Sequence, residues 1–134
     1  MLFPGGFLIA SAVLFAVLWL SEIIPDLLAG RASTSASTWE IPTNPVHVLD
    51  LAIFLPAVFL SGLLLLRRRP LGSATAPGAL IFLGLTALPI MFIPFAAAAR
   101  QQEPVWTILI PMSIVVAGAA VGLWLLLTPP RSHR

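Results

Sequence analysis

The stretch N-P-V-H-V-L-D (Asn44 to Asp50) begins the segment around which this sequence is organised. An asparagine followed by a proline is typical of a helix start, because the amide side chain can cap the first turn and proline fits the first helical position. The apolar run that follows, Val46 to Leu66, ends at three consecutive arginines. A run of about 20 apolar residues can cross the hydrocarbon core of a bilayer as a helix. The stretch therefore predicts a membrane-spanning helix that carries a histidine and a carboxylate near its start.

The composition indicates the same class of protein. Of the 134 residues, 59% are hydrophobic and 9% are charged, whereas about 25% of residues are charged in an average soluble domain. Cysteine is absent, which excludes disulfides, thiol catalysis and thiolate metal sites. The basic residues cluster only beside a span, so nucleic acid is not an expected partner.

Four apolar windows are long enough to span a bilayer. We predict an all-α membrane protein with a single domain over residues 1–134, in which four transmembrane helices form an antiparallel bundle over residues 7–28, 46–66, 78–99 and 105–127. The P-G-G motif at residues 4–6 is expected to precede the first helix, and residues 67–77 to form a basic loop. The first window lacks a basic n-region and is longer than the apolar region of a signal peptide, so we expect it to be retained.

The arginines predict the orientation, because loops rich in Lys and Arg stay in the cytoplasm. Five of the seven lie on the side of the termini and the second loop, so we predict that both termini are cytoplasmic. All five acids fall at the opposite, outer end. The five arginines are Arg67, Arg68, Arg69, Arg131 and Arg134, and the acids are Glu22, Asp26, Glu40, Asp50 and Glu103. Trp39, in the polar loop of residues 30–43, suits the level of the lipid headgroups.

Two patterns inside the spans bear on packing. Proline removes a helix hydrogen bond and tends to kink a helix, and five lie within the windows: Pro25, Pro56, Pro89, Pro94 and Pro111. Gly118 and Gly122 have the small-xxx-small spacing that lets two helix backbones approach closely. We expect these two glycines to have a packing role.

The helix that starts at Asn44 should present one polar face. His47 and Asp50 are spaced i, i+3 and so share a face, which continues through Phe54, Ala57 and Ser61 and should turn toward protein. On the first span Glu22 and Asp26 are spaced i, i+4. At a rise of 1.5 Å per residue, Glu22 lies about 9 Å and Asp50 about 7 Å below the ends of their helices. These matching depths predict one outer-face cluster of Glu22, Asp26, His47 and Asp50, with Arg31 and Arg100 as possible partners from the loops.

Three interpretations of this cluster stay open. It could be a structural set of polar groups that satisfy one another. It could relay protons or bind a cation, because ionisable groups inside a span are a functional-site hypothesis by default. It could also hold a cofactor, with His47 as the intramembrane nitrogen ligand for a divalent cation or for the metal of a haem or chlorophyll; we predict no cofactor. The triplet Arg67, Arg68 and Arg69 is expected to be a topology anchor with some attraction to anionic lipid.

Motifs of catalysis are absent. The sequence contains no G-x-S-x-G, H-E-x-x-H, Walker loop or dinucleotide fingerprint. The sequence therefore carries no positive evidence for an enzymatic activity.

The stretch P-T-N-P-V-H-V-L-D-L-A (Pro42 to Ala52), together with R-R-R-P-L-G (Arg67 to Gly72), resembles a recurring core of uncharacterised bacterial multi-pass membrane proteins. The run W-L-S-E-I-I-P-D-L-L-A-G (Trp19 to Gly30) resembles the span that precedes that core. The resemblance covers roughly the first half of the chain. It supports grouping the four cluster residues and implies no particular activity.

Together these observations predict a small, multi-pass protein of the bacterial cytoplasmic (inner) membrane. We expect an accessory or structural subunit, packed against larger membrane-protein partners or in a homo-oligomer and surrounded by lipid. The chain is short for a self-sufficient transporter and has no substrate-path signature. The alternatives are a proton- or cation-handling protein that uses the outer cluster and, third, an intramembrane enzyme or cofactor-binding subunit.

Overall fold

The computed structural model describes residues 1–31, 36–37, 40 and 43–128. Within these residues the chain is helical and contains no strand. Four described helical segments are long and apolar enough to cross a membrane, which confirms the predicted all-α, four-span class. They are α1 (Leu2–Leu28), the segment Pro45–Leu66, α5 (Pro70–Ala99) and the segment Trp106–Leu127. Trp39, Arg131 and Arg134, which entered the predictions above, lie outside the described residues.

Two helix starts differ from the prediction, and proline explains both. Helix α1 begins at Leu2 and runs through Pro4, where we expected a break. Helix α5 begins at Pro70, within the segment expected to be a basic loop. Proline is tolerated in the first turn of a helix, because the first N–H groups have no partner within the helix. The link between α4 and α5 is therefore only the arginine triplet.

The second span consists of three pieces: α3 (Pro45–Leu49), the π-helical turn η1 (Asp50–Phe54) and α4 (Leu55–Leu66). The predicted N-cap is confirmed, since the Asn44 side chain accepts a hydrogen bond of 3.0 Å from the backbone N–H of Val46. In the π turn the N–H of Leu55 bonds to the carbonyl of Asp50. Pro56, the next residue, has no N–H and its ring would clash with the carbonyl four residues earlier. The wider turn accommodates this proline.

The polar face of the second span turns toward protein, as predicted. His47 and Ser61 are buried, although Ala57 is exposed and Phe54 is 36% exposed. The ring of Phe54 stacks on that of Phe82 in α5, with centroids 4.6 Å apart, and Phe54, Ala57 and Ser61 line a hollow between α4 and α5. Beside this face, Leu55 and Val58 are also buried.

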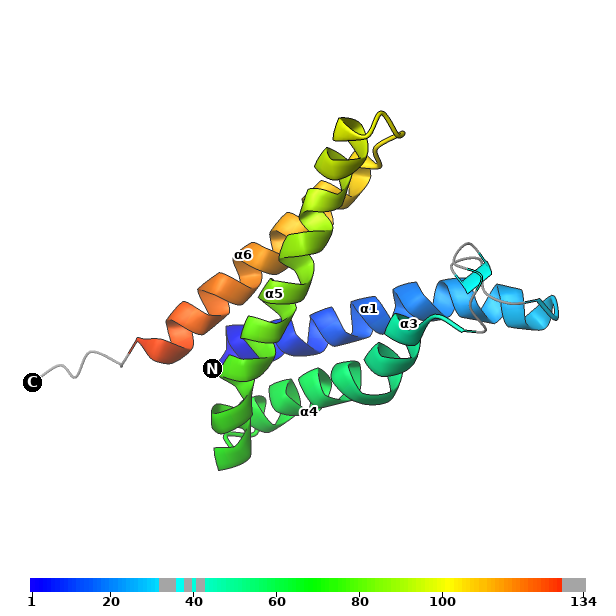
Figure 1. The fold of residues 1–134 in the computed structure, drawn as a ribbon. Coiled ribbons are helices and arrows are strands. Elements are labelled where there is room, and N and C mark those ends of the chain that lie inside the picture. Colours follow the sequence, from blue (N-terminus) through cyan, green and yellow to red (C-terminus); the bar gives the residue numbers. More distant parts are fainter. Residues whose placement is uncertain (32–35, 38–39, 41–42, 129–134) are drawn as a thin grey trace, which may run out of the picture.

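The four spans form two helical hairpins that diverge. Helix α1 packs beside α4, and α5 packs beside α6 (Leu109–Leu127), which follows the 3₁₀ turn η2 (Trp106–Ile108). Figure 1 shows the N-terminus, the α4–α5 turn and the end of α6 on one side of the molecule, which we call the shared end. At the opposite, split end, the arm formed by α1 and α3 points away from the arm that carries the α5–α6 turn.

Small residues let the helices meet. A Cβ added at Gly62 of α4 would lie 2.7 Å from the backbone oxygen of Gly5 in α1, so these two helices are in backbone contact there. The predicted packing pair also lies against neighbouring helices. The ring of Phe7 fills the space beside Gly118, and the Leu80 side chain lies 3.2 Å from the position of a Cβ at Gly122. Close approach through small residues is how membrane helices gain van der Waals contact.

The end of α5 contains a strained residue whose replacement should stabilise the protein. Gln101 has φ of +57°, and the N–H of Gln102 bonds to the carbonyl of Ala97 at 3.0 Å; this is a Schellman-type helix end that favours glycine. We expect Gln101→Gly to raise the free energy of unfolding by about 1 kcal/mol, because the left-handed conformation costs a residue with a Cβ about that much. The thermal midpoint in detergent measures this effect. The matched control Gln102→Gly should give no increase, and an equal increase in both variants would contradict the explanation.

Candidate functional site

The candidate site lies on the arm that α1 and α3 form at the split end. Trp19, Glu22 and Asp26 are spaced three and four residues apart, so they share one face of α1. Across from them, α3 and the start of η1 supply His47 and Asp50. We call these five residues, with Arg31, the polar cluster.

Trp19 joins the two helices and is the cluster member that the sequence analysis missed. Its indole Nε1–H donates a hydrogen bond of 3.0 Å to Oδ2 of Asp50. Its ring lies over the imidazole of His47, with ring centroids 4.5 Å apart and an interplanar angle of 38°. The signal was present in the sequence, since Trp19 precedes Glu22 by one helical turn. A pattern of ionisable residues alone does not include it, because an indole carries no charge.

Glu22 and His47 form the second link across the cluster. Oε2 of Glu22 lies 3.9 Å from Nε2 of His47, and the His47 side chain is only 6% exposed. This separation exceeds that of a direct hydrogen bond. The contact is an ion pair only when the imidazole is protonated. In either state it places a carboxylate beside a buried imidazole, as the predicted grouping requires.

Asp26 is held by Arg31 at the end of α1. The guanidinium Nε of Arg31 donates to Oδ1 of Asp26 at 2.7 Å, and its backbone N–H bonds to the Asp26 carbonyl at 3.1 Å. Gly30, with φ of +65°, makes the tight turn that brings Arg31 back onto the helix. The Asp26 side chain is 5% exposed and that of Arg31 is 67% exposed. A short local motif therefore supplies a positive charge to a buried carboxylate.

The structure does not bring Arg100 to the polar cluster. Arg100 follows the last residue of α5, and Figure 1 shows the α5–α6 turn at the tip of the other arm, away from α1 and α3. The prediction assumed a parallel-sided bundle in which all outer loops meet. The divergence of the two hairpins separates them.

The surroundings of His47 bear on the predicted alternative of a metal or tetrapyrrole ligand. Among the described residues, no three His, Asp or Glu side chains are grouped so that they could hold a metal ion. The imidazole of His47 is buried beside Trp19 and Glu22, so a tetrapyrrole does not fit at this ring unless these neighbours move. Every buried side-chain nitrogen or oxygen in the described part of the chain has a hydrogen-bond partner.

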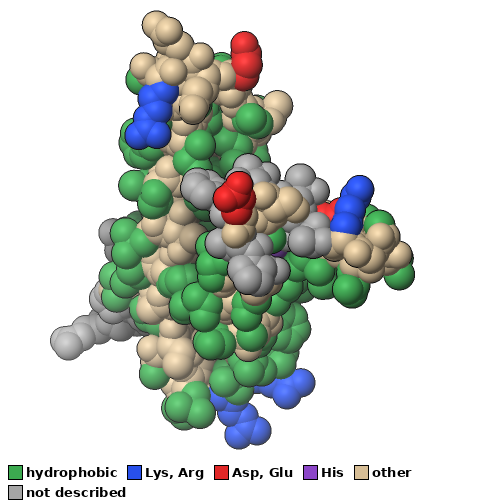
Figure 2. Space-filling view, turned by 45° about the vertical axis from the view of Figure 1, so that its right-hand side comes forward, with side chains coloured by type: hydrophobic (Ala, Val, Ile, Leu, Met, Phe, Trp, Pro, Cys, Tyr) green, Lys and Arg blue, Asp and Glu red, His purple; other side chains and the backbone are tan. Residues whose placement is uncertain are grey.

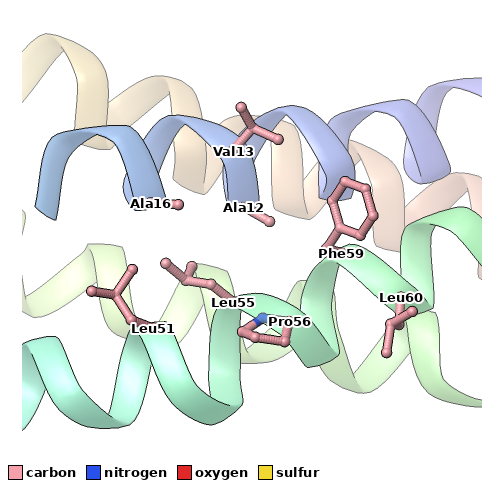
Figure 3. A pocket seen from close by; sticks show the side chains of 8 residues that line it. All are labelled: Ala12, Val13, Ala16, Leu51, Leu55, Pro56, Phe59 and Leu60. Carbon is pink, nitrogen blue, oxygen red and sulfur yellow. The ribbon is translucent and has the colours of Figure 1, made fainter. Parts of the chain in front are cut away.

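Two hollows lie next to the cluster. A crevice of about 120 Å³ separates the arm of α1 and η1 from α5, with Trp19, Asp50 and Thr86 among otherwise apolar lining residues. On another face, a groove of about 400 Å³ between α1 and α4 is lined only by apolar side chains. Figure 3 shows Ala12 and Ala16 of α1 pointing toward Leu51 and Leu55 across this groove. The crevice is therefore the hollow that contains chemically active groups.

The arrangement of charge and apolar surface defines the class of protein. Only 17–28% of each span is buried inside the molecule, and Figure 2 shows hydrophobic side chains over most of the visible surface, with few arginines and acids among them. This is an α-helical, multi-pass membrane protein.

No family model, curated protein or solved structure matches the chain. The resemblance of Pro42–Ala52 to uncharacterised bacterial membrane proteins therefore stays a prediction.

Proposed function

We propose that this chain is a small accessory or structural subunit of a larger complex in the bacterial cytoplasmic membrane. The observation that carries the proposal is the divergence of the two hairpins. It leaves the tips of the two arms apart at the split end, where a compact four-helix bundle would close them against one another. A helix of another membrane protein would pack between these arms.

The bonding within the polar cluster supports a structural role. Asp50 accepts from Trp19, Asp26 accepts from Arg31, and Glu22 lies beside His47. The contacts of Trp19 with Asp50 and of Glu22 with His47 fix α1 against α3 and the start of η1, and so set the shape of one arm. A polar group left without a partner inside a membrane is costly, and this arrangement removes that cost without a substrate.

The proposed orientation follows from the arginines. The described triplet Arg67, Arg68 and Arg69 lies at the shared end, in the α4–α5 turn. Because arginine-rich loops stay cytoplasmic, we place the shared end in the cytoplasm and the split end outside. The bacterial membrane is the proposed location because the resemblance found in the first half of the chain is to bacterial proteins.

Cysteine cross-linking tests where the partner docks, since the chain has no cysteine of its own. Thr86→Cys places a thiol in the crevice, and a benzophenone maleimide attached there should photo-cross-link to a second, different protein in native membranes. The matched control is Leu85→Cys, because Leu85 is one residue away on α5 and 66% exposed. A benzophenone attached at this position should react with lipid. Equal protein adducts from both positions, or none from Thr86→Cys, would argue against the crevice as the interface.

A second candidate, proton or cation handling, is favoured by one observation. The carboxylate of Asp50 lines the crevice, and its described hydrogen-bond donor is the neutral indole of Trp19. If this group carries protons or cations, Asp50→Asn and Glu22→Gln should each slow the pH response of reconstituted vesicles at least about tenfold, whereas Glu103→Gln should leave it unchanged. Identical responses in all three variants and in empty vesicles would remove this candidate.

A further inference from the structure

The turn between α4 and α5 fixes the arginine triplet in one conformation. The N–H of Arg68 bonds to the carbonyl of Leu65 at 3.0 Å, and the N–H of Arg69 bonds to that of Leu64 at 2.9 Å. Arg68 takes the left-handed conformation, with φ of +53°. The three arginines therefore do not extend from a flexible loop, because their backbone is bonded to the end of α4.

Two of the three arginines line a cavity. Arg68 and Arg69 share a hollow of about 310 Å³ with Met1, Leu65 and Ser73, and Leu65 is only 1% exposed. This volume is on the order of ten times the share of one water molecule in the liquid. All three arginines are exposed to the surroundings, but Arg67 does not line the cavity. The triplet thus contains a pair that faces a common space and one residue outside it.

The positive charge in this cavity is not balanced by the described part of the chain. None of the three arginines forms an ion pair with a described residue, whereas Arg31 does. Figure 2 shows the arginines at the lower end of the molecule, with no acidic side chain near them on that face. Guanidinium groups bind phosphate through paired N–H donors, and this geometry makes arginine well suited to phosphate recognition.

We propose that Arg68 and Arg69 hold the phosphate of an anionic phospholipid in this cavity. The cavity lies where an apolar span ends, which is the depth of lipid headgroups, and anionic lipids surround such basic segments in membranes. This role goes beyond that of a topology anchor, because it separates two arginines from the third. It is independent of the proposed accessory function.

Native mass spectrometry of the full-length chain, released from nanodiscs of phosphatidylcholine with one-fifth phosphatidylglycerol, measures the retained lipid. We expect the unmodified protein to keep one phosphatidylglycerol. Arg68→Gln and Arg69→Gln should each reduce the retained fraction about tenfold, whereas Arg67→Gln, which removes the same charge, should change it less than twofold. Arg69→Lys keeps the charge but loses the paired donors, so its retained fraction should lie between that of the unmodified protein and that of Arg69→Gln. Such a graded loss would reflect weaker binding of the lipid and not a failure to fold.

Three results would overturn the proposal. If Arg67→Gln reduces retention as much as the other two variants, the attraction is a general one to the basic turn. If phosphatidylcholine is retained equally, the cavity does not select an anionic lipid. If inorganic phosphate displaces phosphatidylglycerol at equal concentration, the cavity takes free phosphate and not a lipid. Circular dichroism of each variant checks that the helices are intact.

Discussion

Replacing Gly72 by alanine is expected to destabilise the protein by about 3 kcal/mol or more, at the upper end of overpacking effects. A Cβ at this position would overlap the backbone of Leu64 and Leu65 at the end of α4. A side chain could rotate away, but a helix backbone cannot, so the first turn of α5 would have to separate from α4. Chemical unfolding in detergent, followed by circular dichroism, measures the loss.

Gly78 provides the control for this prediction within the same helix. A Cβ at Gly78 meets no atom within 4 Å, and alanine is favoured over glycine in a helix interior by up to about 1 kcal/mol. Gly78→Ala should therefore keep or raise the stability while Gly72→Ala lowers it. Equal stability of the two variants would show that α4 and α5 do not pack closely at the arginine turn. Because that turn shapes the lipid cavity, Gly72→Ala should also release phosphatidylglycerol.

Removing Trp19 should destabilise the protein by a similar amount. Trp19→Ala deletes the indole that bonds to Asp50, lies over His47 and lines the crevice. Large-to-small changes of a packed tryptophan cost about 3–5 kcal/mol, and we expect a loss in that range. Trp19→Phe keeps most of the ring and loses only the N–H donor. It should cost about 1 kcal/mol, the usual net contribution of one hydrogen bond.

Trp124 separates loss of the cluster from loss of any tryptophan. It lies on α6 and is 64% exposed, so Trp124→Ala should change the stability by less than about 0.5 kcal/mol. Urea or SDS titration of the three variants, in one detergent, gives the comparison. If Trp19→Ala is no less stable than Trp124→Ala, the polar cluster does not hold α1 to α3.

The sequence predicts the number of spans well, because about 20 apolar residues are both necessary and easy to recognise. It predicts their starts poorly at Pro4 and Pro70. In the sequence both prolines suggest a break, although each occupies a first turn that needs no N–H from proline. Hydropathy also says nothing about the π turn at Asp50–Phe54, because a wider turn leaves the apolar run unchanged and alters only which side chains face inward.

The candidate site could be predicted only where it depends on local spacing. Glu22 with Asp26, and His47 with Asp50, share faces because of helix periodicity, and the structure places Glu22 beside His47. The position of Arg100 depends instead on how the two hairpins cross, which is decided by close contacts between them such as Gly118 with Phe7 and Gly72 with Leu65. The contact of Gly118 with Phe7 joins residues far apart in the chain, and no periodic pattern encodes it.

The central claim is that this chain is an accessory subunit, and purification from native membranes tests it most directly. The protein would be solubilised in a mild detergent through an affinity tag, and the mass and composition of the purified particle would be determined. We predict a particle larger than the 14.3 kDa chain that contains at least one different membrane protein in fixed ratio. A stable monomer, or a homo-oligomer with no second protein, would contradict the claim.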